Sequence, residues 1–451
     1  MGKQTAPVSI PSTLNALWDD AFRRMIPELP FIIWQDERKT RIVSWKESIA
    51  ISYCMAGFLL SRGIKRGETL GVFSTNNPAV LYIELGARLL GAIPVMIPED
   101  FATLELSEVA QKTNMKMILV SDPDTYHKAL AALGANFQVK DIVTLFDDEQ
   151  VLVPGRTAIF NWLLDPGKAY WRENMPEIKA LKEAVHEDDV CSISWKRDDS
   201  GALVSDIHTH QMLMQRLLAA ELSLQELPEA TSLMPCVPFW DFDNRLKGFY
   251  LPLHRCMRLM IPHATASVEN AIRELKPEVI LISSAQLNGL HARLTSKLSH
   301  KGWYARKRYQ NAIKAGAKWL QTLDNGQKPS IVLKWKCASA KKLLRKGILK
   351  KLNPGLKAIL LSDNGVSDPA ISLFLQLDIP VFSAPGFRIT QGNRDQVVSL
   401  NPIHNAFVHK VETRQEEQQE TDMLDPMPES DSDDGNNKDN HGVISNTKKT
   451  E

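Results

Sequence analysis

Apolar residues along positions 12–147 follow two spacings that alternate. Between residues 44 and 60 they recur every three or four positions, as at Trp45, Ile49 and Tyr53, which predicts an amphipathic helix. Short unbroken apolar runs, such as 70–73, separate helical stretches of this kind and are typical of strands buried on both faces. Helices of about ten residues between buried strands predict βαβ units around a parallel sheet.

The alternation pauses between residues 151 and 187, where prolines and glycines punctuate the chain and we expect a connector with one or two helices. It resumes at residue 190. Further strands are expected at 191–195, 232–237, 258–261, 279–283, 357–361 and 379–383. The pattern predicts an α/β fold of two parallel-sheet subdomains packed together, residues 12–187 with the connector and residues 188–400.

The composition adds that a chain of 451 residues is too long for one hydrophobic core. Its 43% hydrophobic and 24% charged residues are ordinary for a soluble globular protein. Five scattered cysteines indicate reduced thiols, and neither a secretory leader nor an apolar run of membrane-spanning length is found. We therefore expect a cytoplasmic protein, whose attachment to a membrane would be peripheral, at its inner face.

The net charge of +1 hides an uneven distribution. Residues 297–357 carry seventeen lysines and arginines and a single acid, Asp324, whereas residues 411–451 carry twelve acids and four bases. Helical spacing at 303–320 predicts that residues 297–357 form a basic helical insert in the second subdomain. Two interpretations of the insert stay open: solvated surface helices, or a patch for anionic lipid headgroups or CoA phosphates. Nucleic acid is not expected, because no nucleic-acid motif accompanies the charge. Residues 411–451 are expected to form a disordered acidic tail, which either folds back over the insert or only confers solubility.

Several motifs between residues 13 and 393 follow one another in a recognisable order. Residues 70–77 read LGVFSTNN, residues 86–94 read GARLLGAIP, and residues 248–262 read GFYLPLHRCMRLMIP. In this order they resemble the N-terminal domain of the adenylate-forming (AMP-dependent synthetase/ligase) superfamily, and within it the long-chain acyl-CoA synthetases. The resemblance implies that fold and a chemistry that couples a carboxylic acid to AMP and then to a thiol. Fold implies function only by analogy, so the motifs that carry the chemistry decide.

The nucleotide loop departs from the pattern of the family. The family has a Ser-, Thr- and Gly-rich loop whose N–H groups and Lys hold phosphates, followed by Thr-His. Here Thr209-His210 is present, but in residues 196–205 Asp198 and Asp199 occupy the Gly and Thr positions and Val204 the Lys position. Like charges about 4 Å apart cost about 1 kcal/mol in water and about 4 kcal/mol at an effective dielectric of 20, so these carboxylates should repel a triphosphate. The residues that match a degenerate nucleotide site are Trp195, Lys196, Ser200, Gly201, Thr209 and His210.

Two substitutes for the lost lysine stay open, namely Lys196 with Arg197, or a metal that bridges Asp198, Asp199 and the phosphates. His208 lies two positions before His210, and the two rings could share a metal. No third ligand is evident nearby, so a structural or capping role is favoured.

The other motifs of the family are degraded as well. Asp241 stands where the long-chain branch has a His, and residues 363–365 stand where it has Gly-Gly-Ala. Pro385, Arg388 and Ile389 replace the residues that hold adenine, phosphate and Mg²⁺, whereas Phe387 could still stack on a ligand. No carboxylate is left at that point for magnesium, which usually needs at least one. The degenerate adenine and acyl pocket would consist of Asp241, Asp363, Asn364, Gly365, Gly386 and Phe387. The ribose-binding Asp, the hinge and the domain with the catalytic Lys have no counterpart before the acidic tail.

These departures predict an acyl-CoA synthetase-like protein that has lost adenylation and acts as a binding or regulatory protein, with no catalytic residue, no metal site and no cofactor. Candidate partners are an acyl chain or acyl-CoA, an anionic membrane surface through residues 297–357, and a protein. The alternative is an active ATP-dependent long-chain fatty acid–CoA ligase (AMP-forming), which would use ATP, Mg²⁺ and substitute residues.

Overall fold

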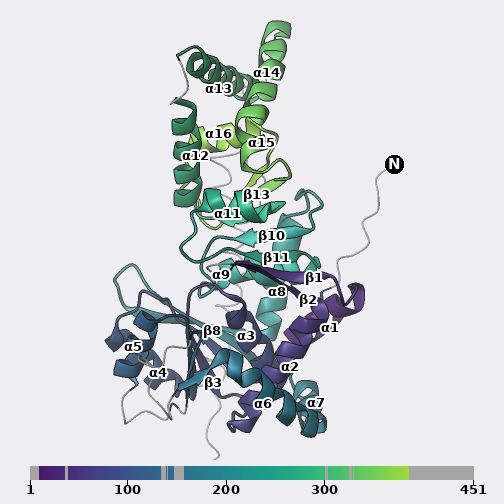
Figure 1. The fold of residues 1–451 in the computed structure, drawn as a ribbon, viewed down its shortest axis with the longest axis vertical. Helices are drawn as coiled ribbons and strands as arrows, with labels where there is room; N and C mark the ends of the chain where they lie inside the picture. The colour runs from purple at the N-terminus through teal and green to yellow at the C-terminus, as the bar shows by residue number, and fades with distance from the viewer. Residues whose placement is uncertain are drawn as a thin grey trace, which may run out of the picture. The chain divides into compact units, whose positions relative to one another are not determined.

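A computed structural model describes residues 10–35, 39–133, 139, 141–146, 157–299, 303–324, 328 and 330–384 of the chain. Within these residues two sheets of seven strands each are surrounded by helices, which confirms the predicted α/β class (Figure 1). Gly386, Phe387 and the predicted acidic tail at 411–451 lie outside the described residues.

The strands of sheet A follow the order β14-β13-β12-β10-β11-β1-β2, and those of sheet B the order β7-β6-β5-β3-β4-β8-β9. Sheet A contains β1 (Pro30–Gln35), β2 (Thr40–Ser44), β10 (Ser232–Pro235), β11 (Arg258–Ile261), β12 (Val279–Ile282), β13 (Ala358–Leu361) and β14 (Val381–Phe382). Sheet B contains β3 (Thr69–Phe73), β4 (Ile93–Met96), β5 (Met117–Val120), β6 (Asp141–Thr144), β7 (Thr157–Ile159), β8 (Val190–Arg197) and β9 (Leu203–Thr209).

The helices are α1 (Leu14–Arg24), α2 (Trp45–Ser61), α3 (Pro78–Leu90), α4 (Thr103–Thr113), α5 (Pro123–Ala132), α6 (Phe160–Glu173), α7 (Met175–Glu183), α8 (His210–Ser223), α9 (Phe242–Arg245), α10 (Leu251–His254), α11 (Val268–Leu275), α12 (Ser284–Ser299), α13 (Trp303–Asp324), α14 (Ile331–Leu344), α15 (Lys350–Leu352) and α16 (Asp368–Gln376). Two π-helical turns, η1 (Leu246–Tyr250) and η2 (Arg345–Leu349), continue α9 and α14. None of the described helices is long and apolar enough to cross a bilayer.

Each sheet takes strands from both of the predicted subdomains, residues 12–187 and 188–400. Strand β8 pairs in parallel with β4 through Val95 and Ile193, and so extends sheet B. Strand β1 pairs in parallel with β11 through Ile32 and Leu259, and so extends sheet A. The expected division between residues 187 and 188 therefore does not separate the two sheets. An apolar run predicts a buried strand but not its neighbour, because any such run fits a parallel sheet equally well.

Local signals fix the ends of the predicted helices. Ser44 and Glu47 form a reciprocal capping box at the start of α2. Asn77 caps α3 ahead of Pro78, and the helix ends at Gly91, whose φ of 67° is left-handed. All thirteen residues of α3 are buried, including two charged ones, so this helix needs buried polar partners.

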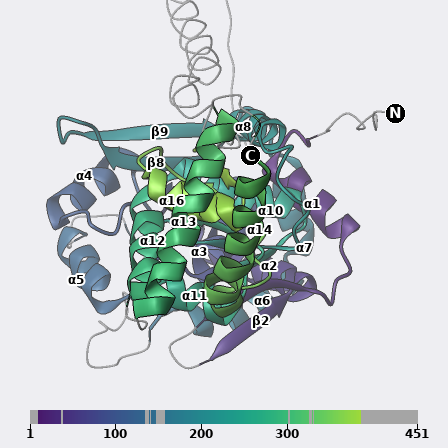
Figure 2. The same ribbon diagram turned by 90° about the horizontal axis from the view of Figure 1, so that it is seen from above.

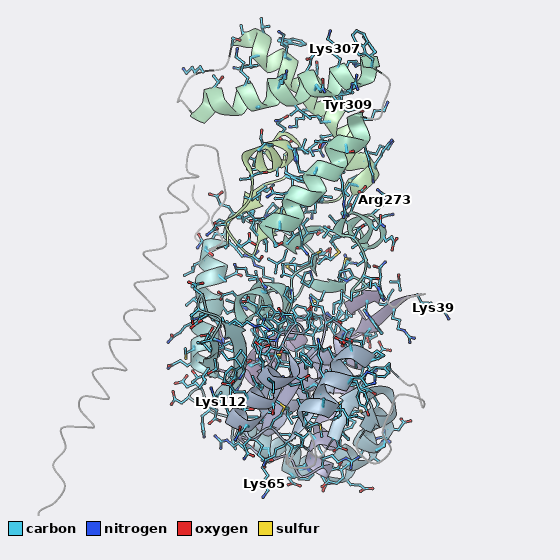
Figure 3. The ribbon with its side chains drawn as sticks, turned by 90° about the vertical axis from the view of Figure 1, so that its left-hand side faces the viewer. Lys39, Lys65, Lys112, Arg273, Lys307 and Tyr309 are labelled. Atoms are coloured by element: carbon cyan, nitrogen blue, oxygen red, sulfur yellow. The ribbon has the colours of Figure 1, made fainter. Side chains whose placement is uncertain are left out.

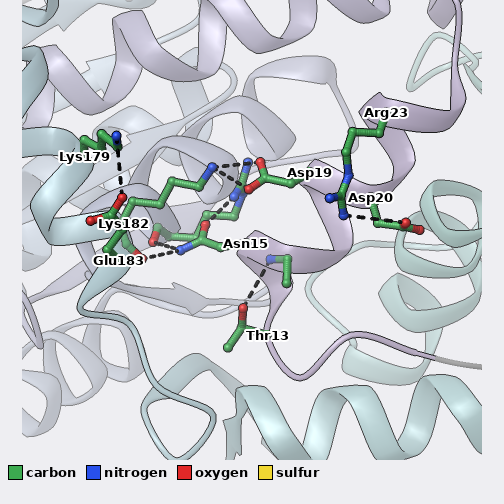
Figure 4. A network of polar contacts seen from close by, with 10 residues as sticks. Thr13, Asn15, Asp19, Asp20, Arg23, Lys179, Lys182 and Glu183 are labelled. Carbon is green, nitrogen blue, oxygen red and sulfur yellow. Dashed lines mark hydrogen bonds and ion pairs between the residues drawn. The ribbon is translucent and has the colours of Figure 1, made fainter.

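One set of partners joins α3 to α1 and α7 (Figure 4). The amide of Asn15 donates to the carbonyl of Arg88 at 3.2 Å, and the guanidinium of Arg88 donates to the Asn15 side chain. The Arg88 guanidinium also lies 5.3 Å from the ring centroid of Trp18. At the rim, Lys182 of α7 pairs with Asp19 of α1 at 2.6 Å. The charge that α3 buries on this side is thus enclosed by polar and aromatic contacts.

Helices α2 and α6 approach each other at two glycines. A Cβ atom on Gly167 would lie 2.1 Å from the carbonyl oxygen of Cys54, and one on Gly57 would lie 2.3 Å from the carbonyl oxygen of Gly167. Pro166 and Gly167 belong to the segment that we expected to be a connector with one or two helices, and both lie inside α6. The glycine is needed for the close approach of the two backbones.

Candidate nucleotide site

The stretch that corresponds to the nucleotide loop, residues 196–205, is a β-hairpin in this structure. Strands β8 and β9 pair antiparallel, with Trp195 opposite Ser205 and Arg197 opposite Leu203, and Figure 2 shows them side by side. Only residues 198–202 form the turn between the strands, and there Gly201 adopts a φ of 84°. Strand pairing therefore replaces the mobile Gly-rich loop that the resemblance implies.

The carboxylate of Asp198 closes this turn. Its Oδ1 accepts hydrogen bonds from the backbone N–H groups of Ser200 and Ala202, both at 2.9 Å, and from the Ser200 hydroxyl at 2.7 Å. The N–H of Gly201 donates to the Asp198 carbonyl at 2.9 Å. The Ser200 hydroxyl, followed by the N–H groups of the turn, lowers the pKa of Asp198. Three successive N–H groups form the kind of nest that binds phosphate in other proteins, and here all three are engaged: two by the Asp198 carboxylate and one by its backbone carbonyl.

Both cations beside the turn are paired with carboxylates. The Lys196 ammonium lies 2.8 Å from Asp206. The Arg197 guanidinium contacts Glu105 through two nitrogens at 2.6 Å each and Asp100 at 3.0 Å. These pairs take up the positive charge that could have replaced the missing lysine, and a triphosphate would have to displace them.

A metal would find few ligands here. In the part of the chain that the structure describes, no group of three His, Cys, Asp or Glu side chains is placed to hold a metal ion. The nearest-lying candidates from the sequence, Asp198 and Asp199, therefore have no third carboxylate among the described residues to complete a site.

Trp195 faces the core rather than the hairpin surface. Its side chain is buried in the cluster that also contains Phe101 and Ile118, and the Lys112 ammonium lies 5.7 Å from its ring centroid. In this position the indole packs sheet B.

Thr209 and His210 support helix α8. The Thr209 hydroxyl accepts from the N–H of Met212 at 3.2 Å and so caps the helix. The Nδ1 atom of His210 accepts from the N–H of Leu14 at 3.2 Å, which ties α8 to α1. Burial lowers the pKa of His210 to about 4, so the ring is neutral and able to accept this bond.

His208 turns the other way. Its ring is 2% exposed and stacks on Phe242, with ring centroids 3.6 Å apart and planes 20° apart. Neither ring nitrogen has a hydrogen-bond partner among the described residues. Burial, aided by the nearby Arg216 and Arg245, lowers the pKa of His208 to about 3. His208 and His210 thus serve separate packing contacts.

A buried polar network that the sequence did not reveal lies beneath the hairpin. Arg245 is fully buried and donates to the Ser192 hydroxyl at 2.7 Å, to the Phe239 carbonyl at 2.7 Å and to the Tyr250 hydroxyl at 3.2 Å. Its guanidinium lies 3.6 Å from the carboxylate of Glu84 in α3, to which Tyr250 also donates. The available signal was Glu84 itself, one of the two charged residues in the apolar helix α3. Between β8, α3 and η1 this chain thus buries an internal ion pair of Arg245 and Glu84.

The residues after the carboxyl ends of the sheet A strands are engaged in caps and bridges. Asp241 follows β10 and caps α9 by accepting from Asn244 at 2.8 Å, and burial raises its pKa. Asp363 follows β13 and accepts from the N–H of Ser284 at 2.8 Å, at the start of α12. Asn364 and Gly365 continue the same loop. The structure therefore places these predicted pocket residues beside sheet A, whereas Ser200 and Gly201 lie on the edge hairpin of sheet B.

Asn76 joins the two groups of strands. It follows β3 of sheet B, and its amide donates to the Val237 carbonyl at 2.7 Å and accepts from the N–H of Phe239 at 2.8 Å, both beyond β10 of sheet A. The first asparagine of the LGVFSTNN motif, Asn76, is thus a bridge between the sheets.

Comparison with known proteins gives this arrangement a context. The sequence pattern of the AMP-binding enzyme family matches residues 21–195. The phenylacetyl-CoA ligase epaB of Aspergillus niger is 24% identical over 173 residues, which are 38% of this chain and 31% of that ligase. The acetyl-coenzyme A synthetase 2 of Kluyveromyces lactis is 29% identical over 113 residues, 24% of this chain and 16% of that enzyme. The matched region thus spans less than a third of these curated relatives.

Solved structures show the same fold. A long-chain-fatty-acid-CoA ligase from Archaeoglobus fulgidus superposes with a TM-score of 0.59 at 13% identity, over 83% of this chain and 64% of that one. The N-terminal domain of FACL13 from Mycobacterium tuberculosis superposes with a TM-score of 0.53 at 14% identity, over 82% and 75% of the two chains. The predicted resemblance is confirmed: residues 21–195 match the AMP-binding enzyme family, and the fold is similar to that of the solved acyl-CoA ligases.

Proposed function

We propose that this acyl-CoA synthetase-like protein does not adenylate carboxylic acids and acts instead as a binding protein. The observation that carries the proposal is the hairpin turn in which Asp198 occupies the N–H groups of Ser200, Gly201 and Ala202. A phosphate would have to expel this carboxylate and then bind beside it, with no unpaired cation from Lys196 or Arg197 to compensate. The turn is stabilised in a form that excludes its expected ligand.

The loss of rate should be large. Removing a single group that stabilises a transition state typically costs a factor of about 100 to 1,000. In this chain several such groups are replaced at once, and because they act as a set their effects do not simply multiply. We expect no adenylation above the uncatalysed background.

The ligand class that we infer is an acyl chain or an acyl-CoA. The support is the fold, since the solved structures that superpose include fatty-acid-CoA ligases. A shared fold supports this ligand class by analogy with those ligases. A protein partner is the other candidate for a regulatory role.

Two assays test the loss of adenylation. The first is ATP–pyrophosphate exchange by the purified full chain in the presence of Mg²⁺ and long-chain carboxylic acids, for which we expect no acyl-dependent signal. The second is calorimetry with ATP, AMP and a long-chain acyl-CoA in turn, for which we expect heat only from the acyl-CoA. Acyl-dependent exchange would overturn the proposal.

The alternative is an active fatty acid–CoA ligase, which the AMP-binding match over residues 21–195 favours. It requires that Mg²⁺-ATP binds the folded chain. A ligand at 100 times its Kd stabilises a protein by about 2.7 kcal/mol, so millimolar Mg²⁺-ATP should then raise the melting temperature. An unchanged melting temperature supports the binding protein, and a rise with Mg²⁺-ATP supports the ligase.

We further propose that the basic insert meets an anionic membrane surface. Helix α13 packs through Tyr309, which faces inward against Gly347 of η2, the continuation of α14, while Lys307 points outward (Figure 3). At the start of α14, Ile331 is 73% exposed and Trp335 is 74% exposed. Exposed apolar and aromatic side chains on a helix pair rich in Lys and Arg suit the interface of a bilayer with anionic headgroups.

The charge of the insert is available for this contact. Several of its basic side chains have no ion-pair partner among the described residues, whereas Lys341 and Arg345 pair with Asp378. The basic side chains without an ion-pair partner in the described part include Arg306, Lys314, Lys318, Lys334 and Lys336. Each basic residue near an anionic surface contributes about 1 kcal/mol.

Vesicle binding tests the membrane contact. We expect the chain to bind phosphatidylserine vesicles, to release them as salt rises and to ignore phosphatidylcholine vesicles. Ile331→Ala and Trp335→Ala should weaken binding, whereas Leu104→Ala, which removes an 83% exposed leucine from α4, should not. Binding that ignores salt and headgroup charge, or equal loss in the Leu104 control, would refute the contact.

A further inference from the structure

A basic cavity opens at the amino-terminal edge of sheet A. Strands β10, β11, β12 and β13 run parallel, so their first residues share one edge of the sheet. A cavity of about 470 Å³ lies there, lined by the start of β10 and β11, the end of α11, and the segment from α15 to β13. Asp241 and Asp363 follow the opposite, carboxyl-terminal ends of β10 and β13, so this cavity is separate from the candidate nucleotide and acyl positions.

Five cationic side chains and one carboxylate line the cavity. The cations are Arg258, Arg273, Lys276, Lys350 and Lys351. The carboxylate is Glu278, and it is already engaged: it accepts from the N–H of Thr231 at 2.6 Å and pairs with Lys357 at 3.2 Å. Because Lys357 already balances its negative charge, Glu278 neutralises little of the positive charge of the lining cations.

Two of the five cations are held in place by the protein. The Arg258 guanidinium donates to the Thr231 hydroxyl at 2.8 Å, and Arg273 pairs with Glu269 at 2.5 Å. Figure 3 shows Arg273 well separated from Lys65 and Lys112, which belong to the sheet B side of the chain. Arg258 thus presents a fixed charge with a geometry suited to the oxygens of phosphate, whereas Glu269 balances part of the charge of Arg273.

The other three cations have no ion-pair partner among the described residues. Lys276 ends α11 in a left-handed conformation, with a φ of 53°, and Lys350 and Lys351 begin α15. All three side chains are exposed. Like charges that share a concave surface repel one another, and a bound anion would relieve that repulsion.

We propose that this cavity binds a phosphate-bearing anion that carries at least two negative charges. Its lining is mostly cationic and contains no aromatic side chain, so it suits a charged group rather than a base or an acyl chain. Its volume lies within the range of small-molecule sites and exceeds that of a single phosphate. The ligand is therefore a small polyphosphorylated molecule or the polyphosphorylated headgroup of a lipid.

The position of the cavity divides the basic insert into two surfaces. Lys350 and Lys351 belong by sequence to residues 297–357, but the structure places them at the edge of sheet A, beyond the packed part of α13 and α14. The cavity proposal does not depend on the proposed loss of adenylation or on the membrane contact of α14.

Titration calorimetry with inorganic pyrophosphate and the full chain is the first arm of the test. We expect binding that weakens as salt rises, a loss of affinity of at least tenfold in Lys350→Gln/Lys351→Gln, and a smaller loss in Lys276→Gln. The control is Lys46→Gln/Lys65→Gln, which removes the same charge from exposed positions on α2 and the loop that follows it, and should bind as the parent does. Circular dichroism checks that each variant is folded.

The second arm uses phosphatidylcholine vesicles with and without a few per cent of phosphatidylinositol bisphosphate. Binding that needs the bisphosphate and is lost in Lys350→Gln/Lys351→Gln identifies a lipid headgroup, whereas pyrophosphate binding without vesicle binding identifies a soluble ligand. Failure of the parent chain to bind either probe, or equal loss in the Lys46/Lys65 control, would overturn the proposal. Neither arm involves ATP turnover, so the outcome is distinct from that of the adenylation assays.

Discussion

Acid sensitivity at the two buried histidines provides the sharpest test of the site geometry. His208 stacks on Phe242 and His210 accepts a hydrogen bond from Leu14, and both rings are 2% exposed. Burial lowers the pKa of His208 to about 3 and that of His210 to about 4. In an unfolded chain both would have the ordinary pKa of about 6.5. Below that pH the unfolded chain therefore binds protons that the folded chain rejects.

The sign follows from this difference. The stability contributed by the two neutral rings is fully present above pH 6.5 and falls as the pH drops toward the folded pKa values, because the unfolded state then gains protons. Each pH unit in this window costs about 1.4 kcal/mol for each ring. Between pH 7.5 and pH 5.0 the loss is about 2 kcal/mol for each histidine, and about 4 kcal/mol for both.

The assay is urea unfolding of the parent chain and of His208→Phe at pH 7.5 and pH 5.0. Phenylalanine preserves the stack on Phe242 and removes a ring that has no hydrogen-bond partner in the described part of the chain. We expect the variant to lose about 2 kcal/mol less than the parent between the two pH values. If parent and variant lose the same free energy of unfolding, His208 is not held neutral and this account of the site is wrong.

Three further changes test the packing around the site. Arg245→Met should lower the free energy of unfolding by about 3–5 kcal/mol because it leaves Glu84 charged and buried. When Arg245→Met is made in the Glu84→Gln variant, the loss should be smaller, and a double-mutant cycle of unfolding free energies measures the difference. Equal losses in the two backgrounds would show that Arg245 and Glu84 are not coupled. Gly167→Ala should destabilise the protein by about 1–3 kcal/mol or more, because the new methyl group clashes with the α2 backbone. Gly289→Ala, at a helical position with open space around it, should stabilise the protein by about 0.5–1 kcal/mol. Melting temperatures that shift in the same direction in both variants would contradict this reasoning. Asn76→Ala should cost about 2 kcal/mol, one for each hydrogen bond lost, in thermal or urea unfolding, and an unchanged midpoint would show that the bridge is dispensable.

Elements whose signals are local were predictable from the sequence. Asn77-Pro78 and Gly91 mark the ends of α3, and the structure has the helix at Pro78–Leu90. The apolar run at 70–73 is β3. Caps, turns and periodicity act within a few residues, so the sequence contains both the signal and the helix or strand that it specifies.

Pairing between distant residues was not predictable in the same way. Nothing in the run at 190–197 distinguishes a neighbour in sheet B from one in sheet A, and the short strand at 40–44 carries exposed residues that hide its pairing with β1. The edge hairpin followed from neither composition nor motif, because the resemblance implied a loop there. Such choices depend on which surfaces meet, and that information is spread over the whole chain.

The candidate site was likewise predictable only in part from the sequence. The replacement of the phosphate-binding residues was visible at Asp198 and Val204, and the proposed loss of nucleotide binding starts from that reading. The closure of the turn on its own carboxylate, and the filling of the space beneath it by Arg245, became visible only in three dimensions. A helix that reads as polar and exposed around Asn244 and Arg245 buries its arginine completely.

The pairing of β1 with the distant strand β11 has a consequence for synthesis on the ribosome. Strand β1 ends at Gln35, and its parallel neighbour β11 begins at Arg258, some 220 residues later. At roughly 5–20 residues per second the ribosome needs roughly 10–45 s to cover that distance. The β1–β2 hairpin therefore emerges long before its second neighbour, with the apolar edge of Phe31 to Trp34 open to other chains. A chaperone that recognises extended apolar segments should meet this protein there first, and a slowed ribosome should lengthen the encounter.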